Sequence, residues 1–328
     1  MKILLADKIP DFAISRLKSM GCEVFSRTGL TGKDLADAVA ETGCEVLVVR
    51  STKVPRPVLE AGHGLKLVIR AGSGFDTIDV AAADELGIRV CNCPGMNSVA
   101  VAELTIGLMI ALDRQIVDET DDLRRGVWNK KKYSSEALGL KGRTLGIIGL
   151  GCVGQEVACR AAAFGMNVMY YDVIRRPELE KQLGVKYSRF DDLIEEADFI
   201  TLHVPGGMQT RHMIGRRELA LMKPTAYLVN CSRGGVVDET ALAESLRCGD
   251  IAGAALDVYE LEPTATDPEF KDPISHEPHL YGTHHVGAST HQAQDAVAEE
   301  MIRVIAAYRD HDEFLHCVNP EKVHVVGG

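Results

Sequence analysis

The sequence of 328 residues has no CxxC pair among its nine cysteines, no apolar run long enough to span a bilayer and no excess of basic residues. The odd number of unpaired cysteines, with a start at Met1–Asp11 that lacks a secretory signal, predicts reduced thiols and a cytoplasmic location. The longest apolar stretch, Val99–Leu112, carries Glu103 and predicts a buried helix. We therefore expect no membrane partner.

The charge balance is acidic, with a formal net charge of −11. A nucleic-acid partner would require a basic surface, so none is expected. The one notable basic cluster is Arg124, Arg125 and Lys130–Lys132, which a solvated loop would explain. Hydrophobic and charged fractions of 46% and 25% are typical of globular chains, and the length favours about two domains.

Short apolar runs alternate with helical patterns in the first part of the chain. The predicted strands are Lys2–Ala6, Glu23–Ser26, Glu45–Arg50, Lys66–Arg70 and Arg89–Asn92, with helices such as Phe12–Met20 and Lys33–Glu41 between them. This alternation predicts a small parallel sheet with helices on both faces.

A second alternating series follows an apolar helix predicted over Ser98–Val117. Its predicted strands are Thr144–Ile148, Asn167–Tyr171, Phe199–Val204, Tyr227–Cys231, Ala252–Val258 and Leu280–Thr283. A helix over Thr290–Asp310 then leaves Phe314–Val326 to rejoin the first domain. We therefore expect an α/β protein of two doubly wound parallel sheets: a Rossmann nucleotide domain, 98–289, inserted into a discontinuous flavodoxin-like substrate-binding domain, 1–97 and 290–328.

A glycine-rich fingerprint opens the second series at Gly149-Leu150-Gly151-Cys152-Val153-Gly154. Gly149 suits a tight turn out of the strand, Gly151 the approach of a pyrophosphate, and Gly154 close packing of helix on strand. Asp172 follows the next strand and can accept hydrogen bonds from a ribose, which favours NAD. Arg175 and Arg176 could hold a 2′-phosphate, but the Asp172 carboxylate would repel it. The alternative is a glycine-rich turn without a ligand.

Three polar side chains, Arg233, Glu262 and His285, each follow a predicted strand of the nucleotide domain. Hydride transfer between a 2-hydroxy acid and a nicotinamide needs a cation for the carboxylate, a base for the hydroxyl proton and a partner that tunes the base. Arg233 suits the first role, His285 the second and Glu262 the third. Taken singly, each is better explained as a surface or loop residue.

Histidines cluster between His276 and His291, which raises the possibility of a metal site. The HxxH at 276–279 lies beside Pro273 and Pro278, so it lacks the rigid helix face on which spaced histidines converge. We expect no metal.

Several motifs occur in the same order as in a known family. They are the fingerprint with Asp172, Asn230–Glu239, Ala254–Val258, Glu262-Pro263 and His285–Thr290. Over essentially its whole length the chain resembles the D-2-hydroxyacid dehydrogenases. The resemblance implies that Arg233 binds substrate, that His285 is the acid/base and that Glu262 is its partner.

The resemblance also implies an NAD site and a homodimer paired through the nucleotide domain. The implied cofactor contacts beyond the three fingerprint glycines are Ser73, Cys152, Val153, Asp172, Val204, Pro205, Cys231, Asp257 and Ala288. Two positions depart from the family pattern, Cys152 in the fingerprint and His284 before the acid/base.

Within the family, the chain is most similar to the phosphoglycerate dehydrogenases of serine biosynthesis, in a short form without a C-terminal regulatory domain. The substrate-binding residues implied are Arg50, Arg70, Gly72, Asn97, Lys130, Arg233 and Gln294. We therefore expect a phosphorylated 2-hydroxy acid, 3-phospho-D-glycerate, as the small-molecule substrate. The alternatives are a glyoxylate or hydroxypyruvate reductase and, in another class, an NAD-sensing binding protein similar to the corepressors that share this fold.

Overall fold

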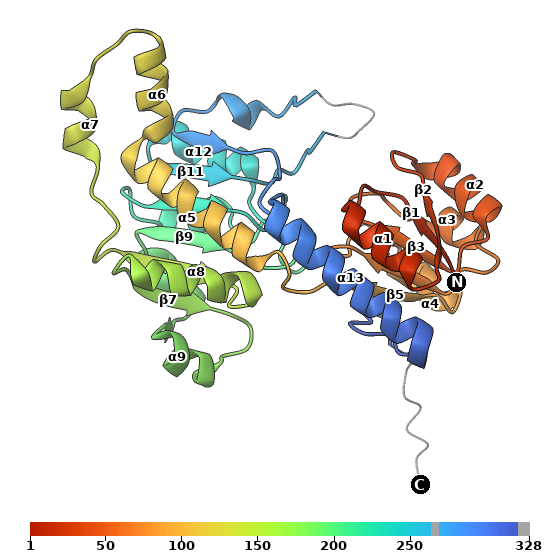
Figure 1. Cartoon of the computed structure of the whole chain (residues 1–328). Coiled ribbons are helices and arrows are strands. Elements are labelled where there is room, and N and C mark those ends of the chain that lie inside the picture. Colours follow the sequence, from red (N-terminus) through yellow and green to blue (C-terminus); the bar gives the residue numbers. More distant parts are fainter. Residues whose placement is uncertain (264–268, 321–328) are drawn as a thin grey trace. The chain divides into compact units, whose positions relative to one another are not determined.

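The structure, a computed structural model, describes residues 1–263 and 269–320 and divides into two compact units. The first comprises Met1–Asn97 and Ser289–Gly328, and the second comprises Ser98–Ala288. Figure 1 shows the chain leaving the first unit at the start of the long helix α5 and returning to it at α13. Each unit is an α/β fold around its own parallel sheet.

The first unit has a five-stranded parallel sheet in the order β2-β1-β3-β4-β5, the flavodoxin-like order. Its strands are β1 (Lys2–Leu5), β2 (Glu23–Ser26), β3 (Val46–Val49), β4 (Leu67–Arg70) and β5 (Arg89–Asn92). All four residues of β3 are buried, as expected for a strand covered on both faces. The predicted strands are therefore present, with ends that differ by at most a residue.

Helices cover both faces of this sheet. They are α1 (Asp11–Ser19), α2 (Gly32–Thr42), α3 (Arg56–Glu60), α4 (Val80–Glu85) and α13 (His291–His311). α1 and α13 share one apolar core, and α2, α3 and α4 share the other. After α13 the chain pairs with β5, where the amide of Val318 donates to the carbonyl of Val90 at 2.8 Å. Of the segment predicted to rejoin this domain, residues 321–326 lie outside the described residues.

The second unit has a seven-stranded parallel sheet in the order β12-β11-β10-β9-β6-β7-β8, which contains the Rossmann order. Its strands are β6 (Thr144–Ile148), β7 (Asn167–Tyr171), β8 (Lys186–Tyr187), β9 (Phe199–Leu202), β10 (Tyr227–Asn230), β11 (Gly253–Leu256) and β12 (Leu280–Gly282). Strand order reverses between β6 and β9. Ligands of open α/β sheets bind at the carboxyl ends of the strands beside such a reversal.

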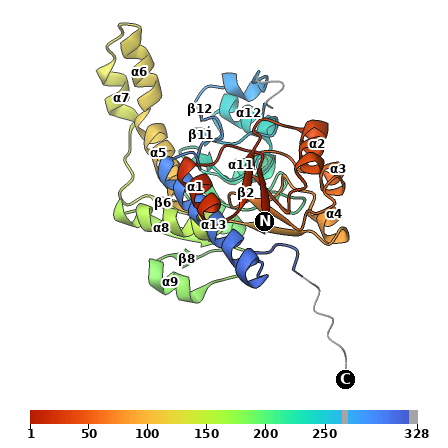
Figure 2. The ribbon, with the colours of Figure 1, turned by 45° about the vertical axis from the view of Figure 1, so that its right-hand side comes forward.

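The helices of the second unit cover both faces of its sheet, and two of them project away from it. They are α5 (Ser98–Arg114), α6 (Ile116–Arg124), α7 (Lys130–Glu136), α8 (Cys152–Ala163), α9 (Pro177–Leu183), α10 (Phe190–Glu196), α11 (Arg216–Leu221) and α12 (Glu239–Cys248). α5 and α8 pack on one face of the sheet, whereas α10, α11 and α12 pack on the other. Figures 1 and 2 both show α6 and α7 projecting beyond the end of α5.

The prediction of one helix over Ser98–Val117 is wrong at its end. Gln115 has a φ of 49°, in the left-handed region, and this ends α5 at Arg114 before α6 begins. Among the described residues, no helix has both the length and the apolar character needed to cross a membrane.

Candidate active site

The glycine fingerprint joins β6 to α8, and its three glycines meet three different constraints. Gly149 has a φ of 95°, and a Cβ there would lie 2.5 Å from the carbonyl oxygen of His203. A Cβ on Gly154 would lie 2.2 Å from the carbonyl oxygen of Gly149, so α8 can pack on the turn only with glycine there. A Cβ on Gly151 would meet nothing within 4 Å. The open space over Gly151, at the start of α8, fits the diphosphate of a dinucleotide.

Asp172, directly after β7, is tied to this fingerprint. Its Oδ2 accepts a hydrogen bond of 2.9 Å from the amide of Leu150. Arg175, which could have held a 2′-phosphate, instead makes two hydrogen bonds of 2.8 and 2.9 Å with Glu180. The site therefore presents a carboxylate at the ribose position, and one of its two nearby arginines is already held by Glu180. These features fit NAD.

The other predicted cofactor contacts of the second unit lie beside strand ends or the fingerprint. Cys152 and Val153 begin α8, Val204 and Pro205 follow β9, Cys231 follows β10, and Ala288 follows β12. Burial raises the pKa of the Cys231 thiol to about 12, so it is a neutral thiol at pH 7. Cys152 is exposed at the first position of α8.

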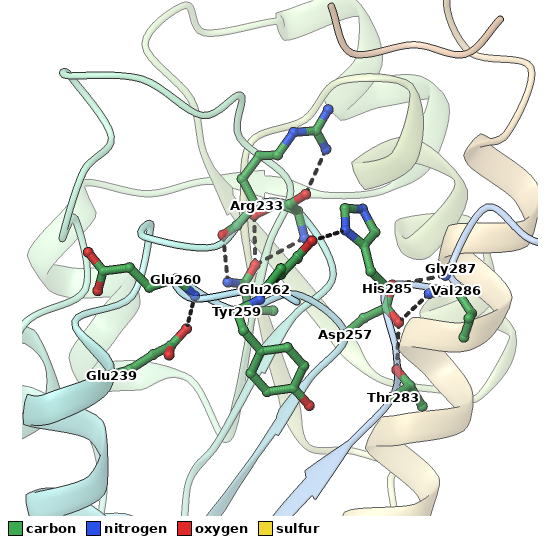
Figure 3. Close-up of polar contacts among 12 residues, drawn as sticks. Arg233, Glu239, Asp257, Tyr259, Glu260, Glu262, Thr283, His285, Val286 and Gly287 are labelled. Carbon is green, nitrogen blue, oxygen red and sulfur yellow. Dashed lines mark hydrogen bonds and ion pairs between the residues drawn. The ribbon is translucent and has the colours of Figure 1, made fainter. Parts of the chain in front are cut away.

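Arg233, Glu262 and His285 follow β10, β11 and β12, three adjacent strands whose carboxyl ends share one edge of the sheet. Figure 3 shows Glu262 and His285 pointing toward each other, with Arg233 beside them. His285 Nδ1 lies 2.8 Å from Glu262 Oε2. The structure thus brings the three predicted groups together, although they lie 52 positions apart at their extremes.

The loop of Arg233 is held by Asn230 and by its glycines. Asn230 Nδ2 donates to the carbonyl of Arg233 at 2.9 Å, and Asn230 Oδ1 accepts from the amide and hydroxyl of Ser232. A Cβ on Gly234 would lie 1.8 Å from the carbonyl oxygen of Tyr259, so only glycine allows the two loops to come this close. Arg233 is therefore anchored to the loop that leads to Glu262.

The loop of His285 is organised by the buried Asp257. The Asp257 carbonyl accepts from the His285 amide at 2.7 Å, and its carboxylate accepts from the Thr283 hydroxyl and from the amides of Val286 and Gly287. These contacts hold His285 at a φ of 51°, which non-glycine residues seldom adopt. The resemblance implies that Asp257 is a cofactor contact; the structure adds that it fixes the backbone of His285.

Glu262 and His285 shift each other's pKa in opposite directions. The hydrogen bond that His285 donates to the Glu262 carboxylate raises the pKa of His285, against the effect of burial, and the Glu262 and Asp257 charges add to the rise. Burial alone would raise the pKa of Glu262, but the hydrogen bond and charge of His285 hold it below its usual value. The pair therefore favours a carboxylate facing an imidazolium.

Replacing Glu262 with glutamine is expected to lower the pKa of His285, because the amide removes the negative charge that stabilises the imidazolium. Proton NMR titration of the histidine rings measures this shift, with the His285 signal assigned by its absence in a His285→Asn variant. Glu244→Gln, a change to a half-buried acid of α12 that pairs with Arg216, is the control. An equal His285 pKa in wild type, Glu262→Gln and Glu244→Gln would show that the charge of Glu262 does not raise it.

Arg50, in the first unit, follows β3 in a loop bound by Asp7. The Asp7 carboxylate accepts from the amides of Arg50, Ser51 and Thr52 at 2.6, 3.1 and 3.1 Å. Burial alone would raise the pKa of Asp7, but these amides hold it below its usual value. Asp7 thus fixes the backbone from which the Arg50 side chain extends.

Arg70 ends β4 and lies over Gly72. A Cβ on Gly72 would lie 1.5 Å from Arg70 Nη1, so this arginine conformation requires glycine there. Ser73 Oγ donates to Asn97 Oδ1 at 2.6 Å, which joins the predicted cofactor contact to the predicted substrate contact. Gln294 lies in the first turn of α13.

Lys130 is not brought to Arg233, Glu262 and His285 within the second unit. It begins α7, beyond α6 and the far end of α5. Gly287, two residues after His285, lies against Val101 near the start of α5. The 17 residues of α5 span about 25 Å. The His285 loop lies near the start of α5 and Lys130 lies beyond its end, so most of the length of α5 separates them.

Comparison with known proteins agrees with this geometry. Residues 106–287 match the model of the NAD-binding domain of the D-isomer specific 2-hydroxyacid dehydrogenases. A D-3-phosphoglycerate dehydrogenase of Methanocaldococcus jannaschii is 47% identical over 93% of this chain and 57% of its own length. A hydroxypyruvate reductase of Thermotoga maritima is also 47% identical, over 80% of this chain and 83% of its own.

Solved structures are similar over nearly the whole chain. A glyoxylate reductase from Paecilomyes thermophila has a TM-score of 0.87 at 30% identity and covers 98% of this chain and 99% of its own. The chain spans about half the length of the phosphoglycerate dehydrogenases that it matches. The sheet order, the fingerprint and the extent of these matches show that the chain belongs to the D-isomer specific 2-hydroxyacid dehydrogenase family and carries its NAD-binding domain.

Proposed function

We propose that this protein is an NAD-dependent dehydrogenase that interconverts 3-phospho-D-glycerate and 3-phosphooxypyruvate. The observation that carries the reaction class is the hydrogen-bonded Glu262–His285 pair beside Arg233, at the edge of an NAD-binding sheet. Such a pair provides an acid/base whose protonation is tuned by its partner. NAD, when bound, supplies the acceptor for the hydride.

Each of the three side chains has one task in this reaction. The Arg233 guanidinium holds the substrate carboxylate through paired, charge-assisted hydrogen bonds. Because His285 Nδ1 contacts Glu262, Nε2 is the nitrogen that takes the hydroxyl proton in oxidation and returns it in reduction. Glu262 keeps the ring oriented and stabilises the imidazolium that forms. The rate of oxidation therefore rises, and the rate of reduction falls, as pH increases through the pKa of His285.

The phosphorylated substrate is supported by the cations of the first unit and by the names of the longer relatives. Arg50 follows β3 and Arg70 ends β4, and the carboxyl ends of strands are where an α/β sheet binds ligands. A specific observation also favours the rival, an unphosphorylated 2-oxo acid: relatives named glyoxylate reductase and hydroxypyruvate reductase are matched over 82% and 83% of their own lengths.

Changing Arg50 to glutamine separates these substrates. If Arg50 holds the phosphate, KM for 3-phosphooxypyruvate is expected to rise by about 10- to 100-fold, the loss of one charged hydrogen bond, while KM for hydroxypyruvate stays nearly constant. Steady-state assays with NADH measure both. Arg56→Gln is the matched control, since Arg56 is a half-buried arginine of the same unit paired with Glu85. Equal changes for the two substrates would favour the rival.

We also propose a homodimer and a place in serine biosynthesis, with the cytoplasmic location kept as a prediction. Support for the dimer comes from the projecting helices α6 and α7, around which apolar side chains are exposed. They include Ile116, Leu123 and Trp128, and Trp128 is 78% exposed. α6 has no buried residue, so a second copy would give this apolar surface a partner.

A further inference from the structure

One peptide unit, Tyr259–Glu260, lies between the Arg233 loop and the start of α12. Its carbonyl faces Gly234, where a Cβ would come within 1.8 Å. Its N–H, from Glu260, donates to Glu239 Oε1 at 2.6 Å. The preceding amide, from Tyr259, donates to Glu262 Oε1 at 3.2 Å. Glu239 therefore supports the backbone that holds the partner of His285.

Glu239 is itself buried against a second acid. Glu239 and Asp272 are each 7% exposed, and their side chains face each other within hydrogen-bonding reach. Asp272 Oδ1 accepts from the amide of Ile274 at 3.1 Å, whereas no donor in the described residues reaches Glu239 Oε2. Two buried carboxylates within hydrogen-bonding reach of each other repel strongly. One proton shared between them removes this repulsion and gives Glu239 Oε2 a hydrogen-bond partner.

The other charged groups around Glu239 are accounted for. The Glu260 carboxylate accepts from Arg211 at 2.7 Å and lies 3.2 Å from His212 Nε2, so these groups face Glu260. Burial, with the Asp257 and Glu239 charges, raises the pKa of Tyr259 to about 12, so its ring hydroxyl stays neutral. Burial and the neighbouring Asp272 raise the pKa of Glu239 to about 8.

We propose that Glu239 and Asp272 share one proton, and that this buried pair positions the Tyr259–Glu262 loop and, through it, the Glu262–His285 pair. Glu239 is thus a positioning residue for the proposed reaction, and the inference rests on that proposed function. When the shared proton is lost, two adjacent carboxylates remain, and their repulsion loosens the loop. Glu262 then supports the imidazolium of His285 less well.

Two substitutions of Glu239 separate the effect of its negative charge from the effect of its hydrogen bond to the Glu260 amide. Glu239→Gln keeps an oxygen that accepts from the Glu260 amide and adds an NH₂ that donates to Asp272, so it mimics the protonated acid at every pH. Glu239→Ala removes both contacts. Glu244→Gln, on the exposed side of the same helix, is the matched control. NMR titration of the His285 ring in each protein reports the loop position without requiring turnover.

The expected His285 pKa is equal in wild type, Glu239→Gln and Glu244→Gln, and lower in Glu239→Ala. Wild type with ¹³C-labelled glutamate carboxyls should also show one carboxyl titrating near pH 8 that is missing in Glu239→Gln. An unchanged His285 pKa in Glu239→Ala, or the absence of that titration from wild type, would overturn the inference.

Kinetics give the second readout. Oxidation of 3-phospho-D-glycerate should rise with pH through His285 and fall again as the pair loses its proton. Glu239→Gln should keep the rise and lose the alkaline fall, whereas Glu239→Ala should lower kcat by about 10-fold or more because the acid/base is misplaced. An identical alkaline fall in Glu239→Gln would overturn the inference. The NMR results together with no turnover of any 2-hydroxy acid would reject only the proposed function.

Discussion

Replacing His285 with asparagine is expected to lower kcat for oxidation of the 2-hydroxy acid by about 10²- to 10⁴-fold, the usual contribution of general acid–base catalysis. Asparagine is preferable to alanine because it tolerates the positive φ of 51° at this position. The affinity for NADH should change little, since the fingerprint and Asp172 are untouched. Stopped-flow turnover and NADH fluorescence titration measure the two quantities separately.

The neighbouring His284 provides the control for this experiment. It is exposed, and it lies one residue before His285 in the same loop, so His284→Asn tests for loop damage alone. We expect its kcat to match that of wild type. Turnover in His285→Asn within about twofold of wild type would rule out His285 as the acid/base.

Replacing Arg233 with glutamine is expected to lower kcat/KM for every 2-oxo acid substrate by about 10²- to 10⁴-fold. The estimate corresponds to two charged hydrogen bonds of about 1.5–3 kcal/mol each. Arg233→Lys should recover only part of the loss, because an ammonium keeps the charge but lacks the planar fork. Steady-state kinetics with hydroxypyruvate, glyoxylate and 3-phosphooxypyruvate measure the effect.

Arg216→Gln, which alters an exposed arginine of the same unit, is the control for Arg233. The loss at Arg233 should be similar for all three substrates, since they share the carboxylate and differ in the tail. A loss confined to the phosphorylated substrate would instead assign Arg233 to the phosphate.

Local sequence signals were sufficient where one short segment determines the structure. The spacing Gly149–Gly154 predicted the turn, the open approach at Gly151 and the packing of α8, and each is present in the structure. The side chains Arg233, Glu262 and His285 could be placed together because parallel strands end at one edge of a sheet.

Sequence signals were insufficient where the supporting contacts join distant segments. Asp7 binds amides 43 to 45 residues away, Asp257 binds amides up to 30 away, and Glu239 supports Glu260 from 21 away. An isolated acid gives no indication of which backbone it will meet. Lys130 stays a prediction from the family resemblance, because its position on α7 does not bring it to Arg233, Glu262 and His285 within the second unit.

The division of residues between the two units has a consequence for how this protein could change its substrate. Arg233, Glu262 and His285 all belong to the second unit, whereas Arg50, Arg70 and Gly72 belong to the first. On the proposed assignment of Arg50 and Arg70 to the substrate tail, mutations at the carboxyl ends of β3 and β4 would alter recognition of that tail without changing Arg233, Glu262 or His285. A family built in this way can diversify its substrates without rebuilding its chemistry.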